Sequence, residues 1–190
     1  VPDGDSVIPI ANRLIRDGGY DVVVASQDWH PANHGSFASQ HLGKKPFEMG
    51  ELSGQPQVMW PDHCVQGTPD AEFHPDLEVS EIDYIQQKGE NPAVDSYSAF
   101  RDNDHAALTG LAGYLKAQQI TELDICGLAT DYCVKFSALD ARDMLPNVNV
   151  RLISDASRGI DPQGMVAHGA AENRAAIREL CGDDILCDGQ

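Results

Sequence analysis

Residues 125–136, ICGLATDYCVKF, decide the fold of this chain and carry its most reactive side chain. An apolar strand over residues 123–128 breaks into a turn there, and the chain restarts as a helix. Cys133 is therefore expected at a helix N-terminus, where unpaired N–H groups and the helix dipole favour a thiolate. The same N–H groups can hold the oxyanion of an attacked carbonyl, so the position suits a nucleophile. A buried structural cysteine is the alternative.

Strand-like and helix-like segments alternate along the whole chain. This alternation predicts an α/β fold with a mostly parallel sheet and right-handed crossovers. The helix predicted over 104–118 should turn Leu108, Leu111, Ala112 and Leu115 inward. The other predicted helices span 5–17, 131–145 and 163–181, and the predicted strands span 21–28, 81–88, 123–128, 147–156 and 183–188.

Length and composition favour one domain over residues 1–190. The chain has 190 residues, of which 42% are hydrophobic, enough for one full core. A net charge of -17 leaves no basic stripe, so a nucleic-acid partner is not expected. No apolar run approaches the roughly 18 residues of a membrane span, and VPDGDS does not resemble a signal peptide. A cytoplasmic protein is expected, and the sequence does not indicate its oligomeric state.

The five cysteines follow no metal-binding or redox spacing. They form an odd set without a CxxC motif, in a chain large enough to fold without disulfides. Reduced thiols are therefore expected. Cys181 and Cys187 flank a short turn and could approach each other, but two reduced thiols remain the preferred interpretation.

Polar side chains collect where the predicted strands end. Asp28 closes one strand, Lys88 closes a second, and the turn at 129–133 follows a third. Parallel sheets bind ligands beyond the carboxyl ends of their strands, so these groups should meet in one crevice. Residues 29–75 show no sustained hydrophobic periodicity. A segment of this length is too long to be only a connection between elements, which predicts a functional loop region.

That loop region contains a candidate metal site. DWHPANHGSF supplies Asp28, His30 and His34, and WPDHC supplies His63. One carboxylate with imidazoles suits Zn, Fe(II) or Mn, and zinc is the expected ion. We take Asp28, His30 and His63 as the core ligands and His34 as optional, because His34 could instead brace the loop. A histidine-rich loop without metal is the alternative.

Three further side chains have expected roles next to this site. Lys88 precedes Gly89 at a strand end, and its ammonium beside Cys133 would favour the thiolate, unless it is simply a solvated lysine. Trp60 and Tyr97 are either ordinary packing residues or an aromatic wall for a flat heteroaromatic ligand.

Four ordered motifs carry a family resemblance. DWHPANHGSF (28–37), WPDHCVQGTP (60–69), KGENPAVDSYSAF (88–100) and GLATDYCVKFSALDA (127–141) resemble the bacterial nicotinamidase/pyrazinamidase branch of the isochorismatase-like cysteine hydrolases. The resemblance runs to about Arg158. It implies a three-layer α/β/α sandwich around a mostly parallel sheet. It also implies hydrolysis of nicotinamide, and of pyrazinamide, to the acid and ammonia through a cysteine thioester, in NAD salvage.

The resemblance extends to single residues. It implies Cys133 as nucleophile and Lys88 as catalytic lysine, with oxyanion-holding N–H groups at Ala129 and Cys133 and a cis peptide between Leu128 and Ala129. It implies that Trp60 and Tyr97 flank the pyridine ring. The implied metal ligands are Asp28, His30 and His63.

One family element has no counterpart here. The family begins with a strand ending in an Asp-x-Gln-x-Asp-Phe type motif, whose first Asp completes the catalytic triad. Independently of the family, the first predicted helix is not preceded by a strand, whereas the later ones follow a strand or loop excursion. We therefore expect an N-terminally incomplete chain with a vacant central sheet position. A natural variant that has lost catalysis is the alternative.

Two other function classes stay open. The chain could be a noncatalytic pyridine- or metal-binding module. It could also be a hydrolase of the same fold that acts on a carbamoyl or ureido amide.

Overall fold

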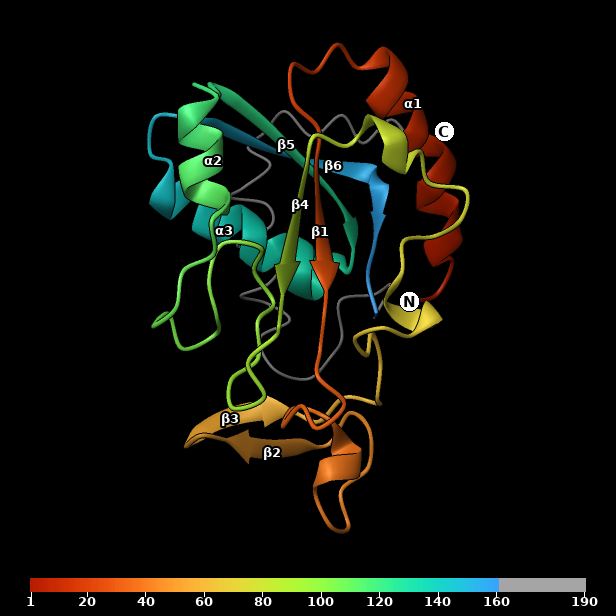
Figure 1. Cartoon of the computed structure of the whole chain (residues 1–190), viewed down its shortest axis with the longest axis vertical. Coiled ribbons are helices and arrows are strands. Elements are labelled where there is room, and N and C mark those ends of the chain that lie inside the picture. The colour runs from red at the N-terminus through yellow and green to blue at the C-terminus, as the bar shows by residue number, and fades with distance from the viewer. Residues whose placement is uncertain (161–190) are drawn as a thin grey trace.

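Two pairs of parallel strands form the centre of the molecule. The computed structural model describes residues 1–160. In it β1 (Val24–Asp28) pairs with β4 (Tyr84–Lys88), and β5 (Glu122–Leu128) pairs with β6 (Asn149–Arg158). Each pair is parallel, and the strands run toward the same end of the molecule (Figure 1). The predicted parallel α/β arrangement is confirmed, and the predicted segments 163–181 and 183–188, with Cys181 and Cys187, lie outside the described residues.

The two pairs do not join into one sheet in the described part of the chain. No ladder connects β1 with β5, and a cavity of about 550 Å³ is lined by both strands and by the inner face of α1 (Val7–Asp17). Lys88 and Cys133 also line this cavity. The cavity thus lies between the two strand pairs and reaches the strand ends that carry Lys88 and Cys133.

Helices pack on the strands through small and aliphatic side chains. α2 (Leu111–Ala117) and α3 (Lys135–Met144) enclose one core with β5 and the start of β6, and α1 contacts β5 and β6. Figure 1 shows α3 behind the strands and α1 to one side of them. The core members that are buried are Ala99, Phe100, Leu111, Ala112, Leu115, Ala138, Ala141, Leu145 and Val150.

The second predicted helix is shorter than expected. α2 begins at Leu111, and Leu108 is 65% exposed rather than inward. An Asp104 carboxylate accepts the Ala106 N–H, and an antiparallel bridge joins Arg101 to Leu108. A side chain that bonds nearby backbone offers an alternative to the helix, so residues before 111 form turns.

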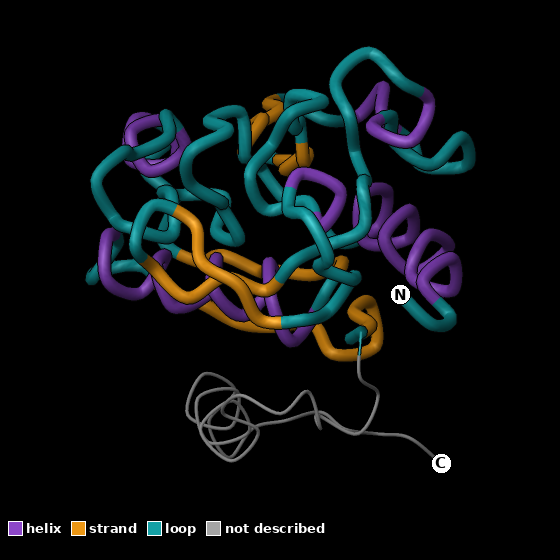
Figure 2. The backbone as a smooth tube through the Cα atoms, turned by 90° about the horizontal axis from the view of Figure 1, so that it is seen from below, coloured by secondary structure: helices purple, strands orange, loops and turns teal. Residues whose placement is uncertain are grey.

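The long loop region contains a hairpin that the sequence did not predict. β2 (Met49–Leu52) pairs antiparallel with β3 (Gln55–Val58) through Ser53 and Gly54, both at positive φ. A two-residue turn with positive φ at both central residues has a twist that matches the twist of the flanking strands. The hairpin lies beyond the carboxyl ends of β1 and β4 (Figure 1), and Figure 2 shows loop segments gathered at this end.

Among residues 1–160, no helix combines the length and the apolar character needed to cross a bilayer.

Candidate active site

The ends of β1 and β4 place Asp28 and Lys88 next to each other. They are register partners, and Lys88 Nζ lies 2.5 Å from Asp28 Oδ1. Nζ also donates a hydrogen bond to the Ser96 carbonyl at 2.7 Å, and Lys88 is only 4% exposed. Burial is the largest single effect and would lower the pKa of Lys88, but the Asp28 carboxylate together with Cys133 and Asp95 raises that pKa above its usual value. The ammonium is therefore a buried, permanent positive charge.

Cys133 meets the same ammonium from the other strand pair. Lys88 Nζ lies 3.5 Å from Cys133 Sγ, so the predicted convergence of three strand ends is confirmed. A cis peptide joins Leu128 to Ala129, as the resemblance implied. Cys133 lies in a single π-helical turn, Thr130–Val134, that continues directly into α3, so its predicted place at a helix N-terminus is confirmed.

Burial and the Lys88 charge act in opposite directions on the Cys133 thiol. Burial raises the pKa of its thiol to about 11, although the Lys88 ammonium acts in the opposite direction. Burial is the larger of the two effects, so the surroundings of the sulfur favour the thiol over the thiolate. A base must take the proton before or during attack.

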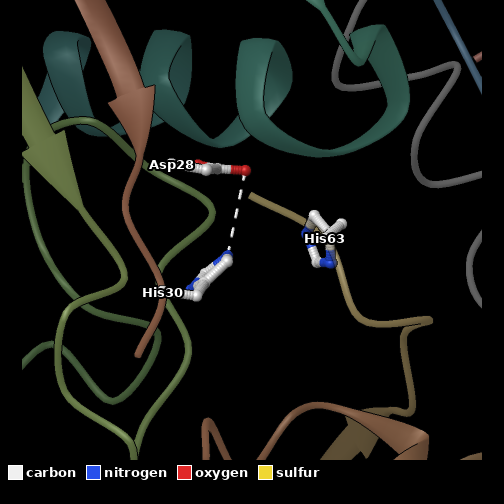
Figure 3. A group of neighbouring side chains, drawn as sticks. All are labelled: Asp28, His30 and His63. Carbon is white, nitrogen blue, oxygen red and sulfur yellow. Dashed lines mark ion pairs between the residues drawn. The ribbon is translucent and has the colours of Figure 1, made fainter. Parts of the chain in front are cut away.

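Asp28, His30 and His63 form a group with the geometry of a metal site. Their ligand atoms all lie within 4.8 Å of one another, and Figure 3 shows the three side chains converging. The Nδ1 atoms of His30 and His63 each lie 2.8 Å from a carbonyl oxygen, those of Gly89 and Pro61. A carbonyl only accepts, so each Nδ1 carries a proton, and Nε2 is the atom of each ring that would bind a metal. The donor set fits a divalent ion of the zinc, iron or manganese kind.

The surroundings of this group keep it in the form that a metal requires. Burial alone would raise the pKa of Asp28, but Lys88 and His30 outweigh it, and the pKa is lowered. Gly89 has a φ of +70°, and a Cβ there would lie 2.3 Å from His30 Cε1. Only glycine therefore allows both the backbone turn and the close approach of the imidazole.

His34 lies beside this group but belongs to a second one. Its ring centroid is 4.5 Å from that of His30, and it shares a ligand-atom cluster with His30 and Asp95 rather than with Asp28 and His63. His34 is fully buried, its Nδ1 lies 2.7 Å from Ser36 Oγ, and burial lowers its pKa to about 4. Its optional role as a ligand stays a prediction, and bracing of the loop is equally supported.

Three aromatic rings form a cluster that includes Tyr132, the residue directly before Cys133. Trp60 and Tyr97 meet edge to face at 6.2 Å between centroids, a contact that ordinary packing and an aromatic wall would both give. Tyr132 completes the cluster, at 4.8 Å from Trp60 and 5.3 Å from Tyr97. We call Trp60, Tyr97 and Tyr132 the ring wall. The sequence interpretation missed Tyr132, although its position directly before Cys133 was an available signal.

Known proteins resemble this chain over most of its length. The nicotinamidase of Escherichia coli (strain K12) is 52% identical over 179 residues, covering 93% of this chain and 83% of that protein. The nicotinamidase/pyrazinamidase structure from Acinetobacter baumanii has a TM-score of 0.84 at 45% identity, covering 94% of this chain and 82% of that one.

Two further structures contain ligands. A pyrazinamidase of Pyrococcus horikoshii in complex with zinc has a TM-score of 0.69 at 36% identity, covering 95% of this chain and 83% of that one. A protein of L. infantum in complex with nicotinate has a TM-score of 0.77 at 31% identity, covering 95% of this chain and 79% of that one. The isochorismatase domain profile matches residues 1–181. The chain belongs to the isochorismatase family.

Proposed function

We propose that this protein hydrolyses nicotinamide to nicotinate and ammonia, and pyrazinamide in the same way, as a step of NAD salvage. The observation that carries the proposal is the contact of Cys133 Sγ with Lys88 Nζ at 3.5 Å, next to the Asp28–His30–His63 group. Relatives named as nicotinamidases support the substrate class.

Binding orients the amide toward the sulfur. The ring wall accepts the flat heteroaromatic ring edge-on or face-on, because aromatic side chains favour such contacts. Asp28, His30 and His63 would hold the divalent ion, zinc being the expected one. The ion would supply a fixed positive charge that positions the ring nitrogen, directly or through a water.

Covalent catalysis proceeds in two halves. The Cys133 thiol gives up its proton and the sulfur attacks the carboxamide carbon, forming a C–S bond and an oxyanion. The N–H groups of Ala129 and Cys133 are the proposed oxyanion donors, and the Lys88 ammonium stabilises the developing negative charge on sulfur. The C–N bond then breaks and the nitrogen takes up a proton to leave as ammonia. Water hydrolyses the thioester and restores the thiol.

We propose that the base that accepts the thiol proton is an aspartate on a strand that occupies the cavity between β1 and β5. An added strand there would pair with both open strand edges and bring an aspartate to Lys88 and Cys133, which line the cavity. The alternative is a form that binds ligand without turnover.

The test compares the 190-residue chain with the same chain carrying an Asp-x-Gln-x-Asp-Phe strand at its N-terminus. Ammonia release from nicotinamide should be at least about 10²-fold faster in the extended chain, the scale of general acid–base catalysis. Cys133→Ala should abolish release in both. Binding of nicotinamide by calorimetry with no release from either chain would instead establish the noncatalytic form.

A substrate panel separates the remaining alternative. Nicotinamide, pyrazinamide, a carbamoyl amide and a ureido amide are assayed for ammonia under identical conditions. Preference for a carbamoyl or ureido compound would replace the nicotinamide proposal with a related hydrolase of this fold.

A further inference from the structure

Gln57 is a buried polar residue on an otherwise exposed hairpin. It is 5% exposed, whereas Gln55 and Pro56 on the same strand face solvent. Gly50 lies opposite it in the register, so the partner strand offers it no side chain. Burying an amide without hydrogen-bond partners costs free energy. The hydrogen bonds of Gln57 therefore show what stabilises its buried position.

The amide nitrogen of Gln57 contacts three acceptors. Nε2 lies 2.9 Å from Asp95 Oδ2, 3.1 Å from the Tyr97 hydroxyl oxygen and 2.9 Å from the Val58 carbonyl oxygen. An amide NH₂ has two hydrogens, which the three acceptors share, so its donor capacity is fully used. Two of the acceptors belong to the loop after Lys88, and the hairpin is thereby tied to that loop.

These bonds fix one ring of the ring wall. Tyr97 stands at 88° to Trp60 and at 69° to Tyr132, and its hydroxyl is the point from which its plane can be held. The Asp95 carboxylate is 3% exposed, and its other oxygen accepts the Ser96 N–H at 2.8 Å. Without Gln57, a buried carboxylate oxygen would lose a donor and the Tyr97 hydroxyl would keep only its hydrogen bond with Trp60.

We propose that Gln57 is a positioning residue for recognition of the substrate ring, acting through Tyr97. It holds Tyr97 against Trp60, so that a heteroaromatic amide meets a preformed slot and binding does not have to order the ring wall. The inference rests on the proposed function, because it assigns the recognition of that substrate to the hairpin. None of the hydrogen bonds of Gln57 in the described part of the chain reaches Cys133, so the effect should fall on binding.

The first test replaces the donor without changing the size of the side chain. Gln57→Leu should raise the Kd for nicotinamide, measured by calorimetry, about tenfold, the scale of one lost buried hydrogen bond. The rate of Cys133 alkylation by iodoacetamide should stay within about twofold, which shows that the reactive centre is intact. Gln55→Leu, on the exposed face of the same strand, is the matched control and should change neither quantity.

The second test needs no ligand. In a cycle of Gln57→Leu, Tyr97→Phe and the double variant, the fall in the urea midpoint of the double variant should be smaller than the sum of the single falls. The same non-additivity is expected for the Kd. Wild-type affinity in Gln57→Leu, or full additivity in the cycle, would overturn the inference. If the wild-type protein fails to bind nicotinamide, the proposed function fails, and the urea cycle still decides whether Gln57 holds Tyr97.

Discussion

Replacing Lys88 by Met should make Cys133 harder to ionise. Methionine keeps the length and most of the volume of the lysine side chain and removes its charge. The charge acts over 3.5 Å between Nζ and Sγ. At an effective dielectric constant of about 20, Coulomb's law gives about 5 kcal/mol, equivalent to roughly 3 pKa units. Cys133 is partly accessible, and water that enters would screen the charge, so 3 units is an upper value.

The sign follows from the two charge states. The ammonium favours the thiolate over the thiol, so its loss raises the pKa of Cys133 further above about 11. Asp28, no longer neutralised, would push it in the same direction. Below the pKa, each unit of increase leaves about tenfold less thiolate at a given pH. Each thiolate becomes about threefold more nucleophilic, so the alkylation rate should fall about threefold per unit.

The assay is iodoacetamide labelling of Cys133, read by mass spectrometry of the peptide, from pH 7 to pH 10 with a chelator present. At pH 9 the rate in Lys88→Met should be about 3-fold to 30-fold below wild type. Lys116→Met, on the exposed side of α2, is the matched control and should label at the wild-type rate. Equal rates for Lys88→Met and wild type, with both proteins folded by circular dichroism, would refute the electrostatic coupling.

Three other changes test the metal group and the core. Gly89→Ala should lower zinc affinity about 10-fold to 100-fold, because its Cβ would displace His30, and competition with a chromogenic chelator measures this. His63→Ala should reduce bound zinc in elemental analysis to well below one equivalent, whereas His41→Ala should retain it; equal loss in both would contradict the assignment. Phe100→Ala should lower the free energy of unfolding by about 3–5 kcal/mol in urea, since Phe100 is 2% exposed, and a change below about 1 kcal/mol would contradict its place in the core.

The hydrophobic pattern was enough to predict those strands and helices whose tertiary contacts favour the same structure as their residue propensities. Within the predicted strands 81–88 and 147–156, residues 84–88 and 149–156 form parallel strands. It failed at 104–110, where an Asp104 side chain competes with the helix, and in the hairpin at 49–58, whose short strands carry Gly and Pro. In these segments, local side-chain bonds and long-range contacts override the pattern.

Some residues of the candidate site could be predicted from the sequence and others could not, for a related reason. Asp28, Lys88 and Cys133 could be placed because parallel strands bring their carboxyl ends together. Gln57 could not, because its importance comes from contacts with residues about forty positions away in the chain. Nothing in the spacing of Gln57 distinguishes it from Gln55.

The sequence by itself therefore determined the α/β class, the strand ends that carry the reactive groups and the motifs of the family. Tertiary structure alone decided how far the Cys133 thiol is desolvated, because the burial that raises its pKa is the sum of packing from many segments. It also decided which histidines share a cluster, since His30, His34 and His63 differ in orientation rather than in chemistry. Charge and residue type are local properties, whereas the desolvation of a group and the direction in which its side chain points exist only once the chain has folded.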